Sequence, residues 1–270
     1  MRETITRTLS GLVYIILLTV SIFYSELTFI LLFGIFLVLA VSEFSDLVQL
    51  PKIASISIAI FAFSLFAFFP LSPATALLLL TGTLVVSAKC LIFLFEKNAI
   101  RLDTTSKFVF LTGYVVLPFI ILTKLPFEDS AFQLYRPEIM ISIFVIIWTN
   151  DTFAFVVGKT MGQTKLFERI SPKKTVEGFV GGMGFGILAA SLIAWYYIKQ
   201  PAFIWIITAV IISVIGTLGD LIQSKFKRLA NVKDSGSIMP GHGGILDRLD
   251  SVIFAAPFVF LFYQILYYVS

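Results

Sequence analysis

Residues Ser224–Asp250 read SKFKRLANVKDSGSIMPGHGGILDRLD and separate two apolar runs, 202–222 and 251–269. The stretch contains five cationic side chains, three acids and His242, the only histidine of the chain. Each flanking run is close to the roughly 20 mostly apolar residues that a helix needs to cross a bilayer. The pattern predicts two membrane-spanning helices joined by a polar segment, and the composition of that segment favours phosphate and metal chemistry.

The whole chain is too apolar for an ordinary soluble domain. Its 270 residues are 58% hydrophobic and 13% charged, with a mean hydropathy of +0.98, whereas soluble domains are about 45–50% apolar and about 25% charged. We therefore predict an all-α, polytopic integral membrane protein. The nine expected spans are 9–24, 27–42, 53–70, 74–95, 108–123, 138–157, 176–198, 202–222 and 251–269.

Basic residues are expected on one side of this topology. Of the 20 lysines and arginines, only Lys124, Arg136 and Lys199 fall in segments that the nine spans place outside. Cytoplasmic segments carry the excess of Lys and Arg in membrane proteins, so we expect a cytoplasmic N-terminus and an external C-terminus. The expected location is the inner (cytoplasmic) membrane of the cell, crossed several times, with the active site facing the cytoplasm.

The chain divides coarsely into N-terminal membrane helices (1–70), middle membrane helices (71–135) and catalytic membrane helices with cytoplasmic loops (136–270). In the first two parts we expect no chemical site. Glu43 and Asp46, near the cytoplasmic end of the second span, are interpreted as solvated acids at a helix end.

Asp151 is a carboxylate within the sixth apolar run, which it interrupts together with its polar neighbours at 149–152. A carboxylate at such a depth is costly unless it is paired, and such residues commonly have a function. We favour a functional role over a simple hydrogen bond to a neighbouring helix.

The sequence SPKKT at 171–175 predicts a helix start, with Ser171 as N-cap and Pro172 in the first helical position. Two lysines in a first helical turn oppose the helix dipole, so helix stability does not explain Lys173 and Lys174. An anion held by these lysines and the free amide groups does explain them.

Acids also recur at helical spacing on both sides of the polar segment. Asp220, Ser224 and Lys227 fall at i, i+4 and i+7 and share one helix face. Asp247 and Asp250 share another face, and like charges three residues apart repel each other. This second face therefore favours a bound cation.

Three aspartates are expected to meet at the cytoplasmic boundary, because the relevant ends of spans six, eight and nine all lie on that side. They are Asp151, Asp220 and Asp247. Carboxylates without matching Cys or His ligands indicate a hard cation, Mg²⁺ before Zn²⁺.

A glycine-rich loop, residues 240–244 (PGHGG), runs into a helix N-terminus between these acids, an arrangement that suits phosphate oxygens. Nearby cations would supply countercharge: Lys225, Lys227, Arg228, Lys233 and Arg248. A metal with a cationic clamp is what phosphoryl or nucleotidyl transfer requires. Two alternatives stay open, a loop-structuring hydrogen bond for His242 and an ion pair with Asp250 for Arg248.

Three motifs together carry a resemblance to a known family. The run S-x-F-K-R-x4-K-D-x-G-x3-P-x-H-G-G-x2-D-R-x-D, residues 224–250, resembles the signature of the phosphatidate cytidylyltransferases, or CDP-diacylglycerol synthases. The stretches NDTFA at 150–154 and SPKKTVEG at 171–178 are similar to two other motifs of that family in order and spacing. The resemblance covers roughly residues 148–253, and the first half of the chain matches only as a set of membrane spans.

The resemblance implies transfer of CMP from CTP to phosphatidate, with Mg²⁺ and a second, monovalent cation. It also implies CTP, phosphatidate and membrane lipid as partners, a homodimer, and no nucleic acid. The implied catalytic residues are Asp151, Lys173, Lys174, Asp220, Asp247, Arg248 and Asp250. The implied substrate-binding residues are Ser171, Lys227, Arg228, Lys233, Asp234, Gly241, His242, Gly243 and Gly244. The implied metal ligands are Asp151, Asp220 and Asp247.

Two other functions fit the sequence less well. A transporter or channel also places acids in the membrane, but it would spread polar residues through the bilayer depth and over both halves of the chain. Here they gather at one boundary in the second half. A membrane-bound alcohol phosphatidyltransferase would carry a D-G-x2-A-R run, which is absent.

Overall fold

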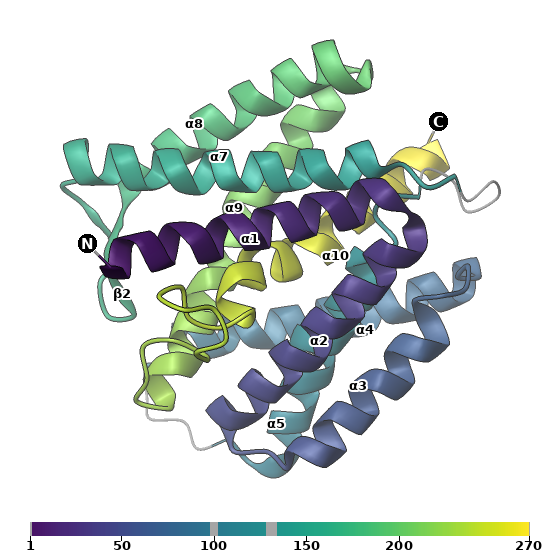
Figure 1. Ribbon diagram of the computed structural model, residues 1–270, viewed down its shortest axis with the longest axis vertical. Helices are drawn as coiled ribbons and strands as arrows, with labels where there is room; N and C mark the ends of the chain where they lie inside the picture. Colours follow the sequence, from purple (N-terminus) through teal and green to yellow (C-terminus); the bar gives the residue numbers. More distant parts are fainter. Residues whose placement is uncertain (1, 98–101, 128–133, 270) are drawn as a thin grey trace.

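The computed structural model describes residues 2–97, 102–127 and 134–269 (Figure 1). Within these ranges the chain is almost entirely helical, with one small antiparallel sheet. The helices of the N-terminal half are α1 (Arg2–Tyr24), α2 (Glu26–Val48), α3 (Lys52–Phe66), α4 (Pro73–Phe95), α5 (Thr104–Phe110), the π-helical η1 (Leu111–Val116) and α6 (Leu117–Leu122). The C-terminal half contains α7 (Pro137–Met161), β1 (Lys165–Phe167), β2 (Ser171–Thr175), α8 (Val176–Leu192), the π-helical η2 (Ile193–Ile198), α9 (Ala202–Leu229) and α10 (Leu246–Val269).

Eight helical segments in the described residues are long and apolar enough to cross a membrane, which confirms the prediction of an all-α, polytopic membrane protein. The expected third span is the exception. It was predicted over 53–70, but α3 is a helix of 15 residues that ends at Phe66. At about 1.5 Å per residue it measures roughly 22 Å, shorter than the ~30 Å hydrocarbon core. The sequence therefore predicted one more full-length span than the described residues contain.

Small residues set the close packing of the last four helices. A side chain at Gly178 of α8 would lie 2.6 Å from the backbone oxygen of Ala154 in α7, and one at Gly182 would meet the oxygen of Asn150 at the same distance. A side chain at Gly219 of α9 would lie 2.7 Å from the backbone oxygen of Asp250 in α10. Close approach of this kind is typical of helices that pack in a membrane. It brings the polar ends of α7, α9 and α10 together.

The segment 171–175 is a strand rather than a helix start. Residues of β2 pair with β1 in an antiparallel hairpin, with Lys165 opposite Thr175 and Phe167 opposite Ser171. The helix that follows begins only at Val176, and its N-cap is Thr175, whose Oγ1 accepts the amide of Gly178 at 3.1 Å. Ser171 as the N-cap was therefore wrong, because local cap signals could not show the pairing with β1. Lys173 and Lys174 lie on a strand and not in the first turn of the helix.

Candidate active site

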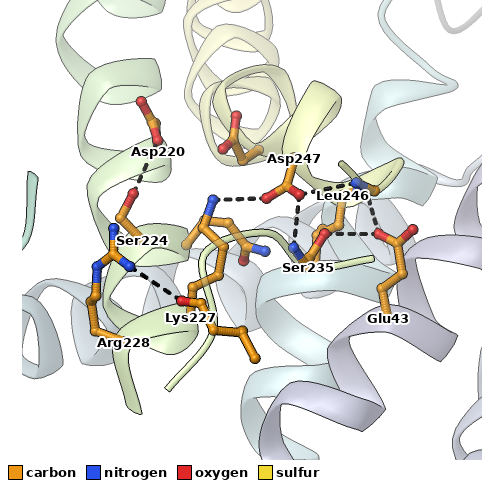
Figure 2. A network of polar contacts seen from close by, with 12 residues as sticks. Glu43, Asp220, Ser224, Lys227, Arg228, Ser235, Leu246 and Asp247 are labelled. Atoms are coloured by element: carbon orange, nitrogen blue, oxygen red, sulfur yellow. Dashed lines mark hydrogen bonds and ion pairs between the residues drawn. The ribbon is translucent and has the colours of Figure 1, made fainter. Parts of the chain in front are cut away.

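Asp220 and Lys174 form the first contact of the site. Asp220 lies on α9, and its carboxylate makes an ion pair with the ammonium group of Lys174 on β2. Ser224, one turn further along α9, donates from Oγ to Asp220 Oδ1 at 3.3 Å (Figure 2). Both members of the ion pair are partly open to solvent, with side-chain exposures of 30% for Lys174 and 29% for Asp220.

Lys174 also lies in the electrostatic field of two further carboxylates. Burial by itself lowers the pKa of this lysine, but Asp220, Asp250 and Asp151 outweigh burial and raise the pKa above its ordinary value. These three acids come from α9, α10 and α7, and only Asp220 contacts Lys174 directly. Asp247, the third acid of the expected metal site, is not among them. Within the part of the chain that the structure describes, no group of three acids, histidines or cysteines lies close enough to hold a metal ion by itself.

Asp247, the other predicted metal ligand on this side, is tightly held. Its Oδ1 is 2.7 Å from Lys227 Nζ on α9. Its Oδ2 accepts the backbone amides of Ser235 at 2.8 Å and Gly244 at 3.0 Å (Figure 2). Only 4% of the Asp247 side chain is exposed. Asp247 thus fixes the base of the loop between α9 and α10.

Glu43 is buried within α2 and is not a solvated acid. Its carboxylate accepts hydrogen bonds from the amides of Ile245 and Leu246 and from the hydroxyl of Ser235, each at 2.9 Å. The interpretation from sequence was wrong for Glu43, and so was the expectation that residues 1–135 contain nothing of the site. Asp46 does lie at the surface, where it pairs with Lys52 at 2.8 Å.

The N-terminal helix α1 holds the glycine-rich loop. Arg7 Nε donates to the backbone oxygen of Gly241 at 2.7 Å, and Ser10 Oγ lies 2.8 Å from His242 Nδ1. Gly241 and Gly243 have positive φ angles of 76° and 86°, which glycine adopts without strain. Burial, Arg248 and Arg7 lower the pKa of His242. The contact with Ser10 supports the loop-structuring interpretation of His242.

A pocket of about 220 Å³ opens between α1, α7 and α10. One side of it is apolar and includes Ile15, Phe144, Ile147 and Trp148. The other side carries the polar residues Asp151, His242, Asp247, Arg248, Asp250 and Ser251. Among the described residues Arg248 makes no ion pair, so its guanidinium is not committed to Asp250. Instead, Asp250 Oδ1 accepts the amide of Ser251 at 2.7 Å.

Other predicted residues do not line this pocket. Ser171 is half-buried on β2, and Lys173, Lys233 and Asp234 are exposed. Arg228 is also exposed and donates to the backbone oxygen of Val232 at 3.2 Å.

Lys225, which was expected to supply countercharge at the site, faces away from it. Its ammonium group donates to the backbone oxygens of Phe93 and Glu96, and it lies 4.5 Å from the centre of the Phe93 ring. The lysine thus caps the C-terminal end of α4. This expectation from sequence was wrong. Several cations lie close together at the end of this helix, and the sequence does not show which of them face the site.

Sequence reasoning missed Arg7, Ser10, Tyr14 and Glu43. Arg7 and Ser10 lie in or just before an apolar run, and their partners are more than 200 residues away. The only local signal was Glu43 itself, an acid that follows a long apolar run.

Comparison with known proteins identifies a family. The sequence model of the cytidylyltransferase family matches residues 5–266. A protein of Staphylococcus aureus (strain COL) named phosphatidate cytidylyltransferase is 42% identical over an alignment of 167 residues, and the match covers 54% of this chain and 64% of that protein. Proteins of the same name from Bacillus subtilis (strain 168) and Staphylococcus saprophyticus are 46% and 47% identical over 117 and 116 residues.

The last two alignments cover 43% and 42% of this chain and 44% of each relative, so the chain matches these curated relatives over less than two thirds of their length. The family model, in contrast, spans nearly all of the sequence. On that ground this chain belongs to the cytidylyltransferase family.

Proposed function

We propose that this protein transfers CMP from CTP to phosphatidate and forms CDP-diacylglycerol and pyrophosphate. The observation that carries the proposal is a pocket that is apolar on one side and carries Asp151, Arg248 and Asp250 on the other, together with the Lys174–Asp220 ion pair, whose lysine lies in the field of Asp151 and Asp250. Charge neutralisation at a membrane boundary is what a reaction between a nucleoside triphosphate and an anionic lipid needs. The names of the relatives support the same activity.

The pocket suits an amphipathic substrate. The apolar side, with Ile147 and Trp148, can contact the hydrocarbon part of a lipid, and Arg248 on the polar side can bind its phosphate. This arrangement favours phosphatidate over a small soluble acceptor. The polar residues gather at one end of the helices, which is why a transport pathway fits less well.

The reaction needs no general base, because the phosphate of phosphatidate is already ionised. One of its oxygens attacks the α-phosphorus of CTP in line, the new P–O bond forms, and the bond from the α-phosphorus to the bridging oxygen breaks. Pyrophosphate leaves with that electron pair. The residues of the chain therefore contribute alignment and countercharge, with Lys173, Lys174 and Arg248 as the proposed phosphate contacts.

The donor set fits Mg²⁺. This ion is usually bound by one or two carboxylates together with substrate phosphates, rather than by a cage of protein ligands. Carboxylates without a complete three-residue cluster meet that description. One or two of the predicted ligands Asp151, Asp220 and Asp247 would hold the ion together with substrate phosphates, and bound Mg²⁺ would neutralise charge on those phosphates. Of the two ion-paired aspartates among these ligands, Asp220 is the more available, because its side chain is 29% exposed, against 4% for Asp247.

Lys174 and Lys227 serve as counterions of Asp220 and Asp247 in the structure. A carboxylate that changes partner leaves its lysine free, and Lys174 is then a phosphate ligand already in place. We place the site at the cytoplasmic face of the inner membrane, as the distribution of Lys and Arg favours. The homodimer and the second, monovalent cation stay predictions.

The test uses purified protein, phosphatidate in detergent micelles, and CTP labelled at either the α- or the γ-phosphorus. Label from the α-position should enter the lipid phase, should stop with EDTA and should return with Mg²⁺. Label from the γ-position should stay in water. Transfer of γ-label to lipid would instead identify a lipid kinase, and no transfer of either label would overturn the proposal.

A further inference from the structure

Glu43 is a buried carboxylate whose described partners are all neutral. Its side chain belongs to α2, and the residue is 4% exposed. It accepts hydrogen bonds from Ile245, Leu246 and Ser235, and it makes no ion pair with a described residue. Burying a charge without a cation is costly and has to be offset by hydrogen bonds. The position is therefore specialised.

Glu43 and Asp247 hold the same piece of backbone from two sides. Asp247 accepts the amide of Gly244, and Glu43 accepts the next two amides, those of Ile245 and Leu246. Ser235 joins both acids, because its amide donates to Asp247 and its hydroxyl donates to Glu43 (Figure 2). These contacts form a clasp, residues Glu43, Ser235, 244–246 and Asp247, that closes the loop 236–243 at its base.

At two glycines of the polar segment, the Glu43 side chain occupies the space that a larger residue would need. A side chain at Gly236 would lie 2.6 Å from Glu43 Oε1, and the three atoms nearest to it all belong to Glu43. A side chain at Gly244 would collide with the other carboxylate oxygen of Glu43. Because real contacts of this kind are never so short, any larger residue at either position would push Glu43 away from the loop.

We infer that Glu43 is a positioning residue of the active site. Through the clasp it sets the first turn of α10, and with it the two residues that follow Leu246, Asp247 and Arg248. Both line the pocket between α1, α7 and α10. The effect of Glu43 on turnover rests on the proposed function, whereas its effect on the structure of the loop does not. A role limited to general stability is the alternative, and the measurements below separate the two.

The first measurement compares Glu43→Gln with Asp46→Asn. Glutamine keeps the shape of Glu43, but its NH₂ group cannot accept the hydrogen bond of a backbone amide. Asp46 is the matched control, since it lies on the same helix, is exposed and, among the described residues, pairs with Lys52 alone. We expect Glu43→Gln to lower kcat about 10–100-fold, the usual effect of removing a group that orients a ligand. KM for CTP should change less than kcat, and Asp46→Asn should leave both unchanged.

The rate of amide hydrogen exchange is a second readout, and measuring it requires no substrate. In Glu43→Gln the peptides that contain Ser235 and 244–247 should exchange faster, while peptides from the middle of α9 and α10 should keep the wild-type rate. A purely structural role would instead raise exchange throughout both helices and lower activity only in proportion to the folded fraction. That result would overturn the inference, as would turnover by Glu43→Gln equal to that of Asp46→Asn.

A double-mutant cycle tests the contact itself, with exchange of the 235–247 peptide as the reading. Gly236→Ala should speed exchange because its side chain displaces Glu43. In a Glu43→Ala background the same substitution meets no carboxylate, so the double variant should match Glu43→Ala. Strictly additive effects would show that Gly236 and Glu43 act independently, against the clasp. If the wild type transfers no label to lipid, the proposed function fails, and the exchange and the cycle still decide the role of Glu43.

Discussion

The candidate active site contains two lysine–aspartate pairs, and they differ in how firmly they are held. Lys174 on β2 and Asp220 on α9 are each about 30% exposed, and Asp220 has one further partner, the hydroxyl of Ser224. Lys227 on α9 and Asp247 on α10 are 12% and 4% exposed, and Asp247 also accepts two backbone amides. The same chemical pair is thus open in one place and enclosed in the other.

The difference suggests separate roles for the two aspartates. Ion pairs on the open surface contribute about 0–1 kcal/mol to stability, and the Lys174–Asp220 pair is partly open to solvent. Asp220 can therefore exchange its lysine for another cation at a lower cost than Asp247 can. Breaking a buried pair by removing one partner costs about 3–5 kcal/mol, because the other charge is left without compensation. Asp247 therefore holds the loop and the start of α10 in place, and Asp220 is the acid more free to meet a metal.

The largest effects should come from neutralising each aspartate in turn. We expect Asp220→Asn and Asp247→Asn both to abolish transfer of α-label from CTP to lipid. Only Asp247→Asn should also destabilise the folded protein, by about 3 kcal/mol, since it leaves Lys227 without its buried partner. Chemical unfolding in detergent measures this difference. A larger loss of stability in Asp220→Asn would reverse the assignment of the two roles.

The comparison also shows what the sequence could and could not reveal. Asp220, Ser224 and Lys227 were placed on one face correctly, because the helical period fixes that relation over seven residues. Glu43 was missed because its partner Ser235 is 192 residues away, and no local pattern encodes such a contact. The strand at 171–175 was mistaken for a helix start because its structure depends on pairing with β1.

The family motifs all lie in the second half of the chain, so the prediction from sequence assigned no site residue to the first half. Residues 150–154, 171–178 and 224–250 do contain most of the acids and cations of the site. However, the loop 236–243 rests on α1 and α2 through Arg7, Ser10 and Glu43. These contacts join single side chains of α1 and α2 to backbone groups or to His242, all far along the chain, and so leave no recognisable spacing in the sequence.

An intermediate effect is expected on metal binding without nucleotide. Lys174 competes with a divalent cation for Asp220, so Lys174→Met should bind Mn²⁺ about tenfold more tightly than the wild type, a difference of about 1.4 kcal/mol. Lys227→Met should show no such gain, because Asp247 stays bound to the amides of Ser235 and Gly244. Electron paramagnetic resonance of free Mn²⁺ during a titration gives both affinities. Equal gains in the two variants would remove the distinction between the pairs.

The smallest expected effect is on the pH dependence of stability of the metal-free protein. The pKa of Lys174 is raised because Asp220, Asp250 and Asp151 outweigh the effect of burial. A lysine that binds its proton more tightly in the folded state contributes fully below the pKa of a free lysine, about 10.4. The contribution is lost as the pH rises through the higher folded-state pKa.

The wild type should therefore lose part of its thermal stability above about pH 10.4, whereas Lys174→Met should lack this part of the decline. Lys173→Met is the control, since Lys173 is the exposed neighbour on the same strand and its removal leaves the pair with Asp220 intact. Unfolding temperatures in detergent between pH 9 and about pH 11 measure the effect. If Lys174→Met declined as steeply as Lys173→Met, the acids around Lys174 would not be holding its proton, and the open pair would be no more than a surface contact.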